Sequence, residues 1–211
     1  MKERPVIFNA EMVRAILDGR KTQTRRPVKF PFFDKNLGCE LAGNELAGEV
    51  RAGNLSNVPF GRIGDRLWVR EAFGMQVRRD GLGGTGEFRV YRASNPDAVK
   101  YTTACGKSVP VKWTPSIHMP RWACRILLEI TAVRVERLSD IRNSDAVAEG
   151  VEPLRGGYWR HYQPGWTQHQ ISARGSFVTL WKSIYGADSW DANPWVWVIE
   201  FKRVGGSDAS K

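Results

Sequence analysis

Cysteine and histidine are scarce in this chain, whose 211 residues include only three of each. Cys39, Cys105 and Cys124 are odd in number and widely separated, which argues against a disulfide framework or a zinc knuckle. We therefore expect these residues to be reduced thiols. His161 and His169 have no partners at metal-ligand spacing, so we expect neither a metal nor another cofactor.

Long hydrophobic runs are also missing. No stretch approaches the roughly 18 consecutive apolar residues that a membrane span needs. The opening sequence, MKERPVIFNA, lacks the apolar run of a signal peptide. These two absences predict a soluble, cytoplasmic protein without a membrane partner.

Positive charge and tryptophan, in contrast, are plentiful. The 32 Lys and Arg residues exceed the 22 Asp and Glu residues, giving a formal net charge of +10. Such an excess favours polyanionic partners, nucleic acid before all others. Nine tryptophans accompany the charge. Aromatic rings among cations suit base stacking, although we expect most of these rings in the core. The length fits one domain with a buried core over residues 1–204, followed by a disordered tail at 205–211.

The most informative stretch is GRKTQTRRP, residues 19–27, which directly follows a well-marked helix end. The preceding helix has Asn9 as a candidate cap and Gly19 where a left-handed terminus belongs. The run itself has the polar, β-branched composition of a strand, which Pro27 would stop. It gathers four cations and two hydroxyls, namely Arg20, Lys21, Thr22, Thr24, Arg25 and Arg26.

Two interpretations of this basic run remain open. Charges on an edge strand commonly prevent unwanted pairing, so the run fits a solvated edge. An anion or nucleotide site uses both charge and hydroxyl donors, and the interleaved threonines favour that alternative. In a regular strand Lys21 and Thr24 point to opposite faces. They meet only if Lys21 lies at the helix–strand turn or the strand bends.

Alternation and capping predict the remaining elements. Strands are expected at 5–8, 60–73, 124–135 and 195–204, and helices at 144–149 and 177–185. Segment 41–50 fits either a short helix or an irregular excursion, and 154–174 is predicted to be a long loop. GLGGTG, at 81–86, is predicted to be a hairpin loop rather than a dinucleotide site, because strand-like residues follow it. The later helix is expected to bury Phe177, Leu180, Trp181 and Ile184.

Glu149 is unusual because it lies in the last turn of the 144–149 helix. A carboxylate there faces the negative end of the helix dipole, at a cost of about 0.3–1 kcal/mol. That field, aided by burial, would raise its pKa, as a general acid near neutral pH requires. The alternative is an exposed, slightly unfavourable glutamate. In the same way, His118 and Arg121 lie in a proline-bounded loop and either face a ligand or are structural.

A distributed set of motifs resembles the ASCH domain family, which shares the small β-barrel of PUA-like RNA-binding domains. The motifs are GRKTQTRR after a capped helix, then GDRLWV, RILLEITAVRVERL, AEG and WVIEF. The family's G-x-K-x-x-x-R pattern falls on Gly19, Lys21 and Arg25 or Arg26. The resemblance implies an α+β fold, a PUA-like barrel with flanking helices and large loop insertions near 29–57, 74–113 and 154–174. The longer form, with WVRE, HMPRW and WDANPWVW, is similar to proteins carried by phages and prophages.

The resemblance also implies a site and a substrate class. Small bacterial members hydrolyse N4-acetylcytidine with a lysine, a threonine and a glutamate, roles that fall by motif on Lys21, Thr24 and Glu149. The implied partner is RNA, a modified nucleoside or single-stranded nucleic acid. Other members resemble ribonucleases or plain RNA-binding modules, so a non-catalytic or nuclease function is the alternative. The residues expected to bind substrate or nucleic acid are Arg20, Arg25, Arg26, Trp68, Arg70, Glu71 and Arg121.

Overall fold

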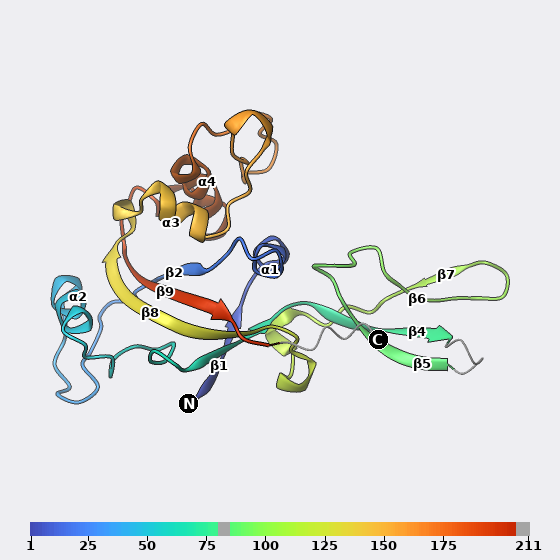
Figure 1. Cartoon of the computed structure of the whole chain (residues 1–211), viewed down its shortest axis with the longest axis horizontal. Helices are drawn as coiled ribbons and strands as arrows, with labels where there is room; N and C mark the ends of the chain where they lie inside the picture. Colours follow the sequence, from blue (N-terminus) through green and yellow to red (C-terminus); the bar gives the residue numbers. More distant parts are fainter. Residues whose placement is uncertain (80–84, 206–211) are drawn as a thin grey trace. The chain divides into compact units, whose positions relative to one another are not determined.

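The computed structural model describes residues 1–79 and 85–205, and within them the chain is a mixed α+β protein (Figure 1). This confirms the expected α+β class. The elements run β1 (Glu3–Ile7), α1 (Ala10–Leu17), β2 (Gln23–Pro27), α2 (Gly43–Arg51), β3 (Arg66–Arg70), β4 (Phe73–Arg79), β5 (Thr85–Tyr91), β6 (Val99–Thr102), β7 (Ser108–Pro110), β8 (Leu127–Arg137), α3 (Asn143–Ala148), α4 (Ala173–Tyr185) and β9 (Trp195–Arg203).

The chain forms two units, which are described separately. The first unit comprises Met1–Lys2, Ala15–Asp65 and Glu129–Lys202, and the second comprises the described residues within 3–14, 66–128 and 203–205. In the first unit, β9 lies between β8 and β2. β2 and β9 are antiparallel, with Thr24 opposite Ile199. Helix α3 packs against both α4 and β2, and Figure 1 draws the two helices on the same side of β2.

The core of the first unit is built on β9. Its residues Val196, Trp197, Val198 and Ile199 are all almost fully buried, so both faces of the strand are covered. A strand buried on both faces is a continuous apolar run, as WVWVI is.

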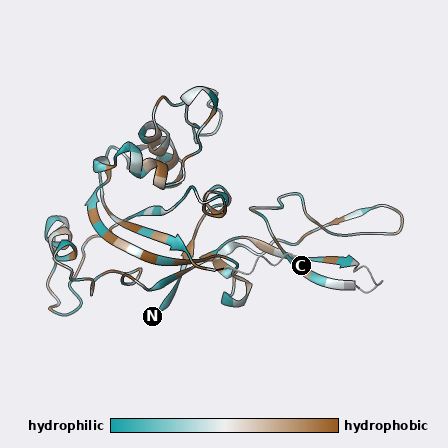
Figure 2. Cartoon of the chain, viewed as in Figure 1, coloured by the Kyte–Doolittle hydropathy of each residue, from teal (hydrophilic) through white to brown (hydrophobic). Residues whose placement is uncertain are grey.

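On β8, Leu128 and Ile130 are buried and alternate with partly exposed residues, as the sequence predicts. Figure 2 shows apolar and polar residues interleaved along this ribbon. The prediction fails in the second half of the strand, because Ala132 is only partly buried and the next buried residue, Val135, is out of phase with the first two.

Helices α3 and α4 differ in detail from the sequence prediction. Helix α4 begins at Ala173, four residues earlier than expected, because the Ser172 side chain accepts a hydrogen bond from the Gly175 amide. Ile184, expected to be buried, is 49% exposed, since it lies in the last turn of the helix. In α3 the expected cap, Ser144, lies inside the helix. The Asp145 carboxylate instead accepts a bond from the Arg142 amide.

The second unit contains the remaining strand pairs. β1 and β3 are parallel, β4 and β5 form an antiparallel pair, and β6 pairs with β7. Leu67 and Val69 of β3 are buried, as the alternation predicts. Gly81–Gly84, most of the predicted hairpin loop, and residues 206–211 of the predicted tail lie outside the described residues. Among the described strands, no set closes into a barrel.

Candidate active site

Lys21 is held at the turn between α1 and β2. The side chain of Asn9 accepts a hydrogen bond from the Met12 amide at 2.8 Å, which caps α1 as expected. The helix ends at Leu17, and Gly19 follows it with a φ of 74°, the left-handed conformation that glycine adopts readily. The Lys21 amide then donates to the Ala15 carbonyl at 2.9 Å. Because β2 starts only at Gln23, Lys21 lies before the strand, at the helix–strand turn.

Glu149 lies at the C-terminal end of α3, where Lys21 meets it. The two residues form an isolated antiparallel bridge, and the Lys21 Nζ donates to the Glu149 main-chain carbonyl at 2.8 Å. An ammonium group at the negative end of a helix is electrostatically favourable. Gly150, with a φ of 84°, turns the chain away directly afterwards. The short AEG motif therefore presents both a carbonyl and a carboxylate to the lysine.

The side chains of Lys21 and Glu149 form a buried ion pair. Their Nζ and Oε2 atoms are 2.9 Å apart, and the two side chains are 2% and 4% exposed. Burial lowers the pKa of Lys21 because a desolvated ammonium is costly, and the charge of Glu149 opposes this shift only in part. A lysine in this environment gives up its proton more readily than one in water. That property is required of a lysine that acts as a base.

Arg25 joins the same ion-pair network from β2. Its guanidinium is fully buried and donates to Glu149 Oε1 at 3.1 Å and to Glu136 Oε1 at 2.5 Å. The ring of Phe177 lies 5.9 Å from the guanidinium carbon. Glu149 is thus held between two cations, one on each carboxylate oxygen. In this arrangement Arg25 positions Glu149, whereas the sequence suggested a cation that contacts substrate.

Thr24 is buried, with 4% exposure, and neighbours Arg25 on β2. Successive strand residues point to opposite faces, so Thr24 and Arg26 share the face opposite Arg25. Arg26 is partly exposed. Arg20, also partly exposed, donates to the Gly150 carbonyl at 2.9 Å and pairs with Asp18 at 3.1 Å. The structure therefore brings together Lys21, Arg25 and Glu149, with Arg20 beside the AEG turn.

Several members of the charged cluster were not predicted from the sequence. Arg134 of β8 pairs with Glu136 at 2.9 Å, with Asp145 at 3.1 Å and with Glu200 of β9. Arg134 and Glu136 are two residues apart on a strand and therefore share a face. The two charged residues on either side of the buried Val135 are the sequence signal for a charged strand face. The sequence alone does not show which part of the protein packs against that face.

The other predicted binding residues belong to the second unit. Arg70 lies over the Trp68 ring, 5.4 Å from its centroid, and donates to the Ile117 carbonyl. Glu71 is buried and accepts two hydrogen bonds from Arg125, at 2.8 and 2.9 Å. Arg121 pairs with the Glu3 carboxylate at 2.7 Å. Each of these charged side chains thus has a protein partner within the second unit.

Residues 1–79 and 85–205 contain no cluster of three or more His, Cys, Asp or Glu side chains arranged to hold a metal ion. In the same part of the chain, no helix has both the length and the apolar character needed to cross a membrane. A scan against protein-family models and searches against curated proteins and solved structures found no match to this chain.

We expect Gly150→Ala to be clearly more destabilising than Gly157→Ala. Both glycines are left-handed, with φ of 84° and 81°, so each alanine costs about 1–2 kcal/mol in backbone strain. A Cβ at Gly150 would lie 2.7 Å from Lys21 Cβ and 2.9 Å from Ala15 Cβ, whereas Gly157 has open space around it. Overpacking adds about 1–3 kcal/mol at Gly150 alone. Urea denaturation measures the difference, and equal losses for the two variants would contradict the close approach to Lys21.

Proposed function

We propose that this protein acts on RNA or a modified nucleoside and hydrolyses the amide of an N4-acylated cytidine, with Lys21, Thr24 and Glu149 as its reactive groups. The observation that carries the proposal is the buried Lys21–Glu149 pair, with its 2.9 Å contact and lowered lysine pKa. The ASCH-like motifs place a lysine and a glutamate at these two positions. Their contact supports assigning them to one reaction.

The proposed steps conserve protons at each stage. The ammonium proton of Lys21 first moves to Glu149 through the hydrogen bond of the ion pair. Neutral Lys21 then accepts the hydroxyl proton of Thr24, whose oxygen attacks the amide carbonyl carbon. Protonated Glu149 then gives its proton to the N4 amine as the carbon–nitrogen bond breaks, leaving an acylated Thr24. The proton on Lys21 returns to Glu149 through their hydrogen bond. Hydrolysis of the ester by water releases the acid and restores the threonine hydroxyl.

The PUA-like barrel and the cellular compartment are part of the same proposal. The described strands form open sheets, so the PUA-like barrel rests on the motif resemblance alone. We also place the protein in the cytoplasm. Cys39, Cys105 and Cys124 are free thiols, which suit a reducing compartment.

We expect the purified protein to release cytidine and acetate from N4-acetylcytidine, and the Thr24→Val variant to release neither. Valine keeps the β-branched shape of this buried residue while removing the hydroxyl. Thr22→Val is the matched control, since Thr22 lies two residues away in the same run and is exposed. Mass spectrometry of products, together with a search for acetylated Thr24 in quenched reactions, measures both the reaction and the nucleophile.

Each result of this experiment decides a separate point. No cytidine from the parent protein would overturn N4-acetylcytidine as the substrate. Hydrolysis that survives in Thr24→Val but fails in Thr22→Val would move the nucleophile to Thr22. Circular dichroism spectra and urea midpoints of the variants show whether a loss of activity reflects chemistry rather than unfolding.

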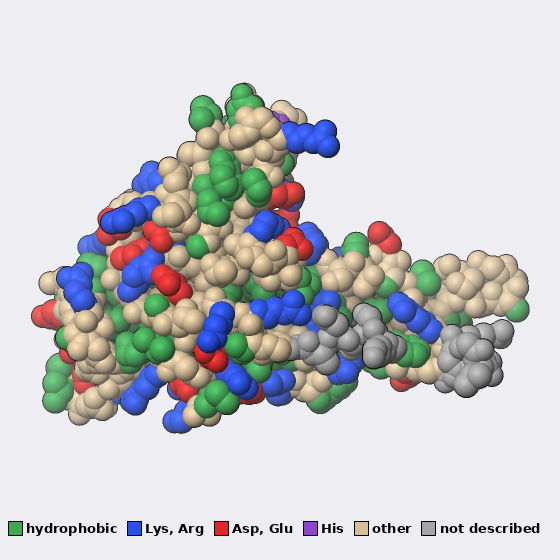
Figure 3. Space-filling view, in the orientation of Figure 1, with side chains coloured by type: hydrophobic (Ala, Val, Ile, Leu, Met, Phe, Trp, Pro, Cys, Tyr) green, Lys and Arg blue, Asp and Glu red, His purple; other side chains and the backbone are tan. Residues whose placement is uncertain are grey.

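The second candidate is nucleic-acid binding without amide hydrolysis, and the net charge of +10 favours it. On the face shown in Figure 3, Lys and Arg side chains are interspersed with Asp and Glu side chains, so positive charge is distributed over that face. Binding to RNA that weakens steeply with salt, in a protein that releases no cytidine, would favour this alternative.

A further inference from the structure

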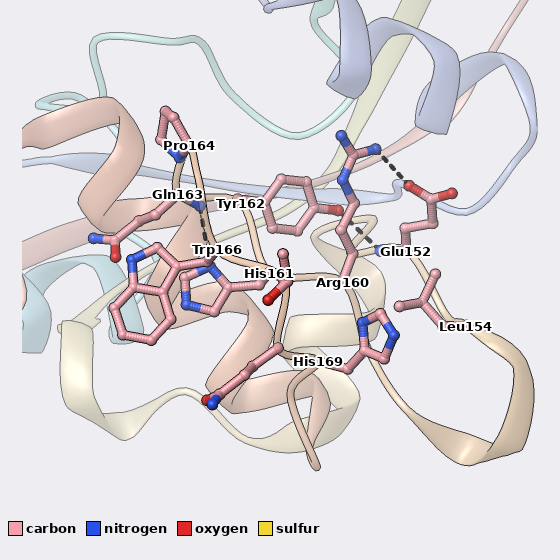
Figure 4. A pocket seen from close by; sticks show the side chains of 11 residues that line it. Glu152, Leu154, Arg160, His161, Tyr162, Gln163, Pro164, Trp166 and His169 are labelled. Carbon is pink, nitrogen blue, oxygen red and sulfur yellow. Dashed lines mark hydrogen bonds and ion pairs between the residues drawn. The ribbon is translucent and has the colours of Figure 1, made fainter.

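The segment between α3 and α4 forms a pocket of its own in the first unit. Its volume is about 480 Å³, within the range of about 300–1,000 Å³ found for ligand pockets. Figure 4 shows the lining side chains gathered around this space. They are Glu152, Leu154, Arg160, His161, Tyr162, Gln163, Pro164, Trp166, Thr167, Gln168 and His169. None of these residues belongs to the Lys21 site described above.

A stacked pair of rings forms one wall of the pocket. His161 and Trp166 have ring centroids 5.0 Å apart and an angle of 13° between their planes (Figure 4). Trp166 is nevertheless 57% exposed, so its indole ring does not lie in the core. The stack fixes the orientation of a large exposed π surface. A third planar ring can stack on such a platform without distorting the protein.

The pocket is held in place by hydrogen bonds rather than by its own core. Trp159 and Gln170 exchange both main-chain bonds, each of 2.8 Å, which closes the base of the segment. The Tyr162 hydroxyl accepts from the Glu152 amide at 2.9 Å, and the Tyr162 amide donates to the hydroxyl of Thr179 on α4. A preformed pocket avoids much of the entropy cost of ordering a loop on binding.

The polar groups of the pocket suit a neutral ring better than an isolated anion. The Arg160 guanidinium already pairs with the Glu152 carboxylate at 2.8 Å (Figure 4). Gln163 and Gln168 add side-chain amides, which offer both hydrogen-bond donors and acceptors. A nucleobase combines a flat face for stacking with an edge that needs such groups. The phosphate groups of a nucleic-acid strand that carries the base are attracted by this chain, whose net charge is +10. Residues 152–174 themselves contain three arginines and one acidic residue.

We propose that this pocket binds a nucleobase of single-stranded nucleic acid, stacked on Trp166 and hydrogen-bonded along its edge by the glutamine amides. The choice of ligand rests on the proposed function, since both assume a nucleic-acid or nucleoside substrate. Binding at Trp166 and hydrolysis at Lys21 are nevertheless measured independently.

The test follows the indole N–H resonance of Trp166 by NMR, assigned from its loss in Trp166→Ala. Cytidine 5′-monophosphate is added in one titration and ribose 5-phosphate, which lacks the base, in another. We expect the first ligand to shift the Trp166 resonance and the second to leave it unchanged. For a short single-stranded oligocytidylate, we expect Trp166→Ala to weaken binding about tenfold, as the loss of one stacked base predicts. Trp166→Phe should restore most of the affinity.

Trp122→Ala is the matched control, because Trp122 is also an exposed tryptophan, at 63%, but lies in the second unit. Equal affinity of Trp166→Ala and the parent would overturn the proposal, as would equal shifts with ribose 5-phosphate. A Trp166 shift caused only by a proline-rich peptide would replace the nucleobase with a peptide ligand. A Trp166 response in a protein that releases no cytidine would keep the pocket and reject the amidohydrolase, and the reverse result would do the opposite.

Discussion

Glu149→Ala is expected to lower the free energy of unfolding by about 3–5 kcal/mol, the loss typical of removing one partner from a buried ion pair. The substitution leaves the charges of Lys21 and Arg25 buried without the carboxylate that both contact. The loss is large against a total stability of about 5–15 kcal/mol for a typical domain. Urea denaturation at neutral pH measures it.

Two comparison variants separate the burial effect from ordinary ion pairing. Asp191→Ala breaks a pair with Lys182 in which the carboxylate side chain is 70% exposed, so we expect a loss of only about 0–1 kcal/mol. Lys21→Met should cost less than Glu149→Ala, because Arg25 still holds the remaining carboxylate. If Glu149→Ala costs no more than Asp191→Ala, the Lys21–Arg25–Glu149 cluster is not buried as the structure shows.

The second large effect concerns turnover. We expect Lys21→Met to slow N4-acetylcytidine hydrolysis by about 10²–10⁴-fold, the contribution of a positioned general base. Methionine keeps the apolar stem of the buried side chain and removes its basic nitrogen. Lys202→Met, which alters a largely exposed lysine paired with Glu129, should leave the rate unchanged. Rates are measured by product release under single-turnover conditions.

The lowered pKa of Lys21 gives this reaction a defined pH dependence. The reactive form, neutral Lys21 beside protonated Glu149, holds one shared proton, as the ion pair does. The rate should therefore fall as pH rises and Lys21 of the ion pair loses that proton. Because the pKa of Lys21 lies below the ordinary value of 10.5, this fall should occur at a pH below 10.5. Lys21→Met should lack the fall. A parent rate that does not change with pH, or the same fall in Lys21→Met, would exclude the proposed proton sharing between Lys21 and Glu149.

The sequence determined much of the local structure by itself. It predicted α1 with its Asn9 cap and Gly19 end, and the apolar run of β9, and the structure confirms these features. Capping bonds and strand alternation involve neighbouring residues, so their signals lie in short stretches of sequence. The α+β class follows from the same elements. Element boundaries were less accurate, as the early start of α4 shows, because a cap such as Ser172 competes with other nearby polar residues.

The candidate site was predicted only in part. The motifs pointed to Lys21 and Glu149, but their contact across 128 residues is a result of tertiary packing. Tertiary structure also decided that Arg25 is buried between Glu136 and Glu149, where the sequence suggested a surface cation. The charged face of a strand looks the same in a sequence whether water or a helix covers it. Its function depends on that cover, and here α3 and α4 provide it.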